Sequence, residues 1–195
     1  MASTLHIAQH PEADQMLSTD PLALVLGMLL DQQFPMERAF AGPYVLAQRI
    51  GVTRLDAAAL AAHDPDTLAA AFALTPVVHR YPKAMAARTQ DLCRILVDKY
   101  DGSAARLWET AATGKELLAR VAALPGFGKQ KAQIFVALLA KQLDVRPDGW
   151  EQQVGAYSDD GFRSVADVVD AASLQKVRDH KKQMKAQQRT AEAGR

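Results

Sequence analysis

The segment LPGFGKQKA, residues 124–132, contains the residue types and spacing that most clearly suggest chemistry. Gly126 and Gly128 permit a turn too tight for a side chain. A helix that starts directly after such a turn has free backbone N–H groups and the positive end of its dipole. A phosphate can bind there without any base being read, and Lys129 and Lys131 flank the position. The alternative is a glycine-bearing connection between two packed helices.

This segment resembles the hairpin of the helix-hairpin-helix (HhH-GPD) DNA glycosylase superfamily. Leu29-Leu30-Asp31-Gln32-Gln33 is similar to the LL-x-x-Q helix end that borders the DNA cleft in that superfamily, and Lys83-Ala84 matches a pair that opens a later helix. Asp148, 24 residues after Leu124, lies near the family's spacing for an aspartate. Together these matches cover roughly residues 22–150 and resemble a small actinobacterial-type branch without an iron–sulfur cluster.

The resemblance implies an all-α base excision repair DNA glycosylase that binds double-stranded DNA. Asp148 would be the catalytic carboxylate, stabilising a cationic sugar and helping water to attack the glycosidic carbon. Gly126, Phe127, Gly128, Lys129 and Lys131 would contact DNA. The structural alternative for Asp148 is the first residue of a D-x-x-E capping box that opens the next helix.

The lyase members of the superfamily have a lysine two residues after the second hairpin glycine, and this chain has Gln130 there. An amide cannot form the imine that strand cleavage requires. We therefore expect a monofunctional enzyme that leaves an abasic site and has no lyase activity.

Enzymes of this kind must take the target base out of the stack, and further residues could fill the space it leaves or stack on the extruded base. Gln33, or Gln32, could fill the space that the base leaves, and both could equally be polar residues at a helix end. Aromatic side chains that could stack on the base, or belong to the core, are Phe40, Tyr44, Tyr81 and Trp150. His79 and Arg80, in a loop bounded by prolines, could face the cleft or a phosphate, but a solvated loop is the favoured interpretation.

The resemblance also allows a monovalent cation, Na⁺ or K⁺, on the backbone carbonyls of Ala122, Leu124 and Phe127. No other cofactor is expected, because the single cysteine, Cys93, cannot assemble a thiolate cluster.

Two other functions remain open. The hairpin alone would suit a DNA-binding protein with weak or no catalytic activity, and the altered GWEQQ sequence after Asp148 favours that alternative. A helical protein–protein adaptor is the third, and it would leave the glycines and lysines of the hairpin unexplained.

The elements that must position these residues are helices, because alanine and leucine abound and alternating strand patterns are almost absent. Asp20-Pro21 starts an apolar, central helix. We expect a second helix after Pro35 that breaks at Gly42-Pro43, and two short helices that begin at Asp56 and Asp64. Further helices are expected over residues 83–100, 104–110, 115–123, 129–143, 164–172 and 173–188. The helix-hairpin-helix occupies about 115–142.

We expect a helical domain over residues 18–142 and a second helical half from residues 1–17 and 143–195. The chain is 195 residues long, 49% hydrophobic and 23% charged, as in ordinary globular proteins. Its net charge is only +1, but residues 176–195 contain seven Lys or Arg against two Asp or Glu. This basic C-terminal helix could add phosphate contacts or be a solvated surface helix.

No signal peptide or membrane-spanning stretch is visible in the sequence. We therefore expect a cytoplasmic, nucleoid-associated protein, most simply a monomer.

Overall fold

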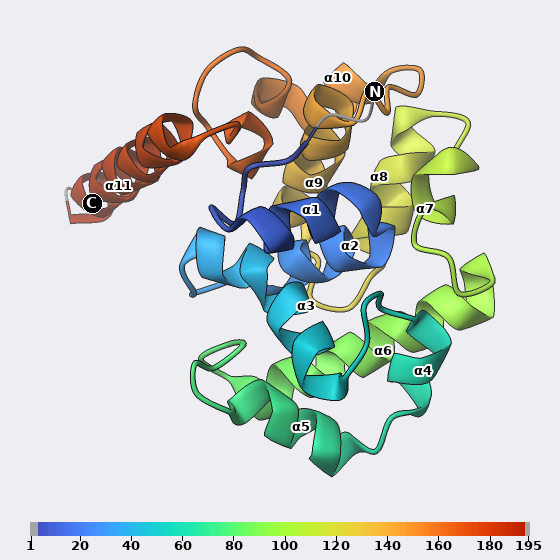
Figure 1. The fold of residues 1–195 in the computed structure, drawn as a ribbon. Coiled ribbons are helices and arrows are strands. Elements are labelled where there is room, and N and C mark those ends of the chain that lie inside the picture. The colour runs from blue at the N-terminus through green and yellow to red at the C-terminus, as the bar shows by residue number, and fades with distance from the viewer. Residues whose placement is uncertain (1–3, 194–195) are drawn as a thin grey trace.

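The computed structural model describes residues 4–193, and all regular structure in that range is helical (Figure 1). The α-helices are α1 (Pro11–Thr19), α2 (Pro21–Leu30), α3 (Met36–Ile50), α4 (Ala57–Ala62), α5 (Pro65–Ala73), α6 (Pro82–Tyr100), α7 (Arg106–Glu109), α8 (Gly114–Ala122), α9 (Lys129–Gln142), α10 (Trp150–Val154) and α11 (Ala171–Ala193). Two 3-10 turns, η1 (Gly155–Tyr157) and η2 (Val165–Asp167), lie between α10 and α11. The predicted all-α class is confirmed.

Helix α2 is the centre of the N-terminal part of the fold. Asp20 caps its first turn, accepting hydrogen bonds from the backbone N–H groups of Leu22 (3.0 Å) and Ala23 (3.3 Å). Residues 22–30 are all buried, as expected for a helix that is apolar on every side. The polar residues that follow its last turn are therefore held at a fixed place on the core.

Helix α3 runs through Gly42-Pro43 without the break that we expected. A proline inside a helix removes one backbone hydrogen bond, but tight packing compensates here. A side chain at Gly42 would come within 2.6 Å of Leu30 Cδ1. Gly42 therefore allows α3 to pack closely against the end of α2.

The C-terminal third also departs from the helix boundaries that we expected. The expected helix over 164–172 is only the 3-10 turn η2, because Ser164 and Asp167 form a capping box that closes a single turn. The short helix α7 covers only Arg106–Glu109 of the expected 104–110. The basic C-terminal helix is confirmed and longer than expected, beginning at Ala171.

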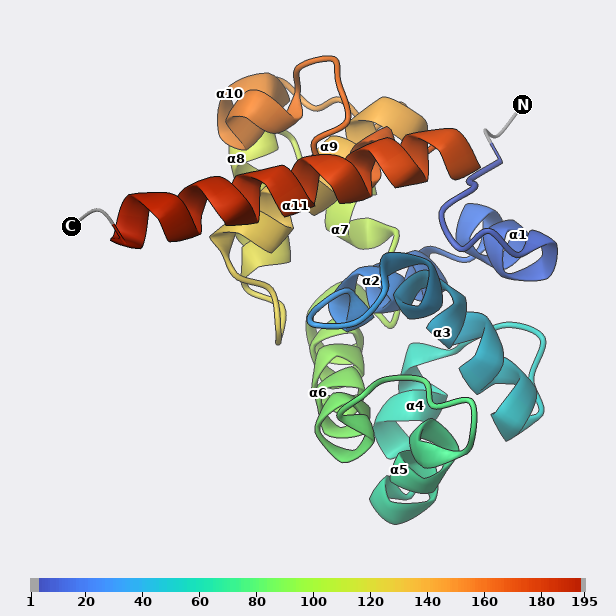
Figure 2. The ribbon, with the colours of Figure 1, turned by 90° about the vertical axis from the view of Figure 1, so that its left-hand side faces the viewer.

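The helices pack in two groups. Helices α1 to α6 pack on one another around α2, α3 and α6, whereas α8, α9, α10 and the two 3-10 turns form the second group. Figure 2 shows α11 running across the face of the molecule between these groups. This grouping divides the chain near residue 100, and the division into 18–142 and two terminal segments stays a prediction.

No helix within residues 4–193 is both long enough and apolar enough to cross a membrane.

The cap at Asp20 provides a test of this architecture. Besides its two bonds to α2, the buried carboxylate accepts a hydrogen bond from the Leu55 backbone N–H at 3.1 Å. Asp20→Ala should lower the free energy of unfolding by about 2–3 kcal/mol in urea, because it removes a cap and leaves a buried donor unpaired. The exposed cap Asp56, with one bond to Ala59, is the control: Asp56→Ala should cost only about 1 kcal/mol. Equal losses of unfolding free energy in the two variants would show that the hydrogen bond from Leu55 to Asp20 adds no stability.

Candidate functional site

The helix-hairpin-helix that the sequence predicts is formed by α8, α9 and the turn between them. Gly126 has φ +79°, a left-handed conformation that suits glycine. Gly128 is the N-cap of α9 at φ −90° and ψ 177°, and no side chain caps that helix. The expectation that both glycines are needed for the turn is wrong for Gly128, since a Cβ there would meet no atom within 4 Å. The open space leaves the first turn of α9 accessible to a ligand.

The hairpin packs on the end of α2, almost a hundred residues earlier in the chain. A Cβ on Gly126 would lie 2.6 Å from Leu29 Cδ1. The Lys131 amine donates a hydrogen bond to the Leu29 carbonyl at 2.9 Å. Two of the segments that carry the family resemblance, around Leu29 and around Gly126, therefore meet in space.

The start of α6, with Lys83-Ala84 in its first turn, lies beside the same region through Gln32. The side-chain oxygen of Gln32 accepts a hydrogen bond from Arg88 of α6 at 3.3 Å, and its nitrogen donates to the Leu29 carbonyl at 3.0 Å. Gln32 is thus held in the structure, whereas Gln33 next to it is exposed.

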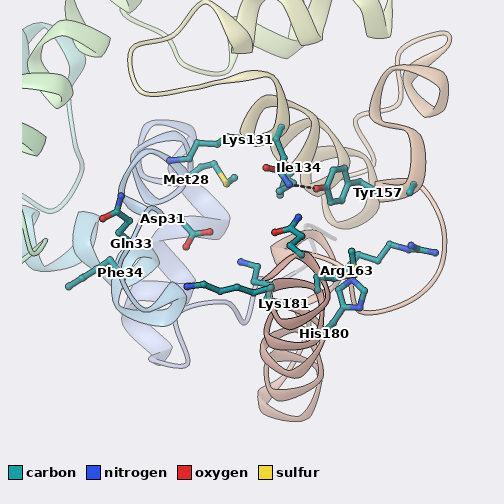
Figure 3. Close-up of a pocket in the computed structure, with 15 residues that line it drawn as sticks. Met28, Asp31, Gln33, Phe34, Lys131, Ile134, Tyr157, Arg163, His180 and Lys181 are labelled. Carbon is teal, nitrogen blue, oxygen red and sulfur yellow. Dashed lines mark hydrogen bonds between the residues drawn. The ribbon is translucent and has the colours of Figure 1, made fainter. Parts of the chain in front are cut away.

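A cavity of about 810 Å³ lies between the end of α2, the first turns of α9 and the underside of α11 (Figure 3). Its lining combines apolar side chains with cations and amides. The lining residues are Met28, Asp31, Gln33, Phe34, Gln130, Lys131, Ile134, Ala156, Tyr157, Arg163, His180, Lys181, Met184, Lys185 and Gln188. A space of this size and mixed polarity can hold an organic ligand of nucleoside size.

Asp31 is the one carboxylate in this lining. It follows the last residue of α2, and Figure 3 shows it pointing into the cavity. Burial raises the pKa of its carboxyl, while Lys181 and then Lys131 lower it and Glu37 raises it. Figure 3 shows Lys131 of α9 and Lys181 of α11 reaching into the same space.

Lys131 is the second perturbed group in the lining. Burial lowers the pKa of its amine to about 8, against the attraction of Asp31. The amine also lies 5.6 Å from the centre of the Phe127 ring, which is itself buried against Phe135. Neighbouring Gln130, in the position of the family's lysine, donates a hydrogen bond to the Tyr157 hydroxyl at 2.9 Å.

The structure does not bring Asp148 into this cavity. Its backbone carbonyl accepts a hydrogen bond from Gly114 N–H at 2.8 Å, beside the start of α8, whereas the hairpin follows the end of that helix. The capping-box interpretation of Asp148 is wrong, because Gly149 is the N-cap of α10 and no side chain caps it. The left-handed conformation of Gly149 (φ +73°) displaces the start of α10 by one residue. The Asp148 side chain is exposed.

The other predicted residues divide between the cavity and the core. Gln33 lines the cavity, and its side-chain oxygen accepts a hydrogen bond from the half-exposed Tyr81 at 3.5 Å. Phe40 and Trp150 are buried in the core, and Tyr44 packs beside His10. None of these three lines the cavity.

His79 is also not the solvated loop residue that we expected. It is fully buried, its Nε2 is hydrogen-bonded to the Gln32 carbonyl at 3.0 Å, and burial lowers the pKa of its imidazole. Its ring packs against Phe34. His79 therefore supports the segment that carries Gln32 and Gln33.

The monovalent cation expected on the carbonyls of Ala122, Leu124 and Phe127 stays a prediction. The Leu124 carbonyl already accepts a hydrogen bond from Phe127 N–H at 3.1 Å. Within residues 4–193, no cluster of three His, Cys, Asp or Glu side chains could hold a metal ion.

Sequence reasoning missed several cavity residues, above all Asp31, Tyr157, Arg163 and His180. For Asp31 one signal was available: it is the charged residue that ends an otherwise uniformly apolar helix. For the lysines of α11 the basic sequence allowed either phosphate contacts or a solvated surface, and it did not indicate that they line a cavity.

Comparisons with known proteins add no relative. No family model matches the chain, no curated protein sequence matches it, and no solved structure matches it. The site must therefore be interpreted from its own chemistry.

Lys131 should make stability depend on pH in a specific direction. Below pH 8 its amine is protonated in both the folded and unfolded chains. Between about 8 and the ordinary 10.5 the unfolded chain binds more protons, so the free energy of unfolding should rise with pH in that window. Urea unfolding of the wild type and Lys131→Met should show a difference that narrows from pH 7 to pH 10, with the variant more stable at pH 7. A difference in unfolding free energy that stays the same from pH 7 to pH 10 would contradict a lowered pKa for Lys131.

The position of α11 over the cavity can be tested through its ion pair. Arg178 of α11 lies 2.5 Å from Glu37 of α3. Glu37→Arg and Arg178→Glu should each make amide hydrogens of α11 exchange several-fold faster, although they change net charge in opposite directions. The double exchange Glu37→Arg/Arg178→Glu should restore wild-type protection. If one single variant speeds exchange in α11 and the other slows it, the change in net charge, and not the ion pair, would be the cause.

Proposed function

We propose that this chain is a DNA glycosylase that hydrolyses the N-glycosidic bond of an extruded base. One observation carries the proposal: the helix-hairpin-helix lies against the end of α2, and a nucleoside-sized cavity with a carboxylate opens beside that junction. The first turn of α9, uncapped and flanked by Lys129, suits a DNA phosphate. The cavity suits the base that is taken out of the stack.

The charges of the lining support a nucleic-acid substrate. Lys131, Arg163, Lys181 and Lys185 line the same cavity as one carboxylate, Asp31. Cations hold the phosphates next to an extruded nucleotide, and the apolar side chains of Met28, Phe34 and Ile134 can contact a base. Gln33 at the rim is available to replace the base in the duplex.

The reaction that we propose is hydrolysis without strand cleavage. Gln130, tied to Tyr157, is no nucleophile. The leading alternative is a DNA-binding protein without excision activity, and the position of Asp148 beside α8 favours it over an enzyme that depends on Asp148.

The function is tested with duplexes that carry uracil, an alkylated purine, 8-oxoguanine or an A·G mispair. We expect at least one to yield an abasic site whose strand breaks only after alkali, and borohydride to trap no covalent complex. Trapping that disappears in Lys131→Arg would identify Lys131 as an amine nucleophile and the enzyme as a lyase. Duplex binding without excision of any lesion would favour the DNA-binding alternative.

The hairpin contact is tested separately at Gly128, whose replacement disturbs no neighbour. Gly128→Val should weaken binding to damaged and undamaged duplex by a similar factor, about 10-fold, because the contact positions the DNA without reading it. Lys129→Gln should weaken binding as well. Lys99→Gln, an equal charge change at an exposed site near the far end of α6, is the control and should have little effect. Unchanged binding in Gly128→Val would exclude the hairpin as the DNA contact.

A further inference from the structure

Asp31 has no structural role that explains a carboxylate at its position. No hydrogen bond to its side chain is present among the described residues, and its oxygens are not enclosed by protein atoms. The buried aspartates behave differently: Asp14 accepts backbone hydrogen bonds from Ala8 and His10, and Asp20 caps α2. Asp31 is thus held in a partly enclosed place where burial disfavours its charge.

Two lysines oppose the effect of burial on the Asp31 charge. Lys131 from α9 and Lys181 from α11 favour the ionised carboxylate, and Glu37 from α3 opposes them. Glu37 is occupied by Arg178 and does not line the cavity. No ion pair joins Asp31 to either lysine, so its oxygens stay open to a molecule in the cavity. The other charged groups in the lining are Arg163, His180 and Lys185.

From this arrangement we infer that Asp31, in place of Asp148, is the catalytic carboxylate of the cavity. The inference rests on the proposed function and names the residue that performs its chemistry. As the bond between the sugar C1′ and the base nitrogen breaks, its electron pair leaves with the base, which takes a proton from water. The Asp31 carboxylate stabilises the sugar cation. It then takes one proton from the water whose oxygen joins C1′, and releases that proton to solvent.

Lys131 and Lys181 are positioning residues in this scheme. They act through Asp31, by keeping it ionised, and not on the sugar itself. A carboxylate that stabilises a sugar cation in this way is expected to lower the free energy of unfolding, because its charge is partly buried without an ion-pair partner.

The decisive experiment uses binding, so that it does not depend on knowing the lesion. Two duplexes are compared, one with a neutral tetrahydrofuran abasic site and one with a cationic pyrrolidine in its place. The wild type should bind the cationic site at least about 10-fold more tightly. Asp31→Asn should lose this preference, while Asp98→Asn, at an exposed position on α6, should keep it.

Asp148→Asn separates the inference from the proposed function. Loss of the preference in Asp148→Asn and its retention in Asp31→Asn would overturn the inference and leave the glycosylase proposal standing. A wild type that prefers neither abasic duplex over intact DNA would overturn both. Asp31→Asn should unfold at the same or a higher urea concentration than the wild type, and a clear loss of stability would show that Asp31 is structural.

The positioning role is tested by pH. Lys181→Met should raise the pH below which the preference for the cationic site is lost, because one cation that favours ionised Asp31 is removed. Lys182→Met, on the same helix but outside the cavity lining, is the control. An unchanged pH profile in Lys181→Met would exclude this role for Lys181.

Discussion

The contact between Gly126 and Leu29 is the constraint on which the rest of the site depends. The hairpin lies close against the end of α2 at Gly126, where a Cβ would lie 2.6 Å from Leu29 Cδ1 and would force that side chain to shift. This approach brings the Lys131 amine to the Leu29 carbonyl and the first turn of α9 beside the residues that follow α2. One cluster of buried apolar residues runs through both groups of helices, and the cavity lies where these two segments meet.

The electrostatics of the cavity follow from that approach. Lys131 is partly buried where its amine donates to the Leu29 carbonyl, and burial lowers its pKa. Asp31 is brought there by the end of α2, and burial raises its pKa. Opposite shifts in two neighbouring groups are typical of functional sites, because a protein that needed only stability would neutralise or pair such charges.

Helix α11 completes the site from outside the two groups. It lies across the face between them (Figure 2). One wall of the cavity is formed by its residues His180, Lys181, Met184, Lys185 and Gln188. Its docking depends on the Arg178–Glu37 pair and on the contact of its first turns with η2. Surface ion pairs contribute little stability, so most of the anchoring comes from Leu174 and Val177, which are buried in the core. Residues 181–190, which carry most of the wall, are exposed.

Local sequence patterns were enough to predict the all-α class, many of the helix starts and the hairpin. Asp20, Asp56 and Asp64 each cap the helix that their position predicted, because capping depends only on neighbouring residues. The uniformly apolar run of residues 22–30 likewise fixed the burial of α2. Tertiary structure decided what local patterns cannot encode: the continuity of α3 through Pro43, the burial of His79, the position of Asp148 beside Gly114, and the meeting of Asp31, Lys131 and Lys181. These outcomes depend on contacts between segments far apart in the chain, and such contacts leave no spacing in the sequence from which they could be predicted.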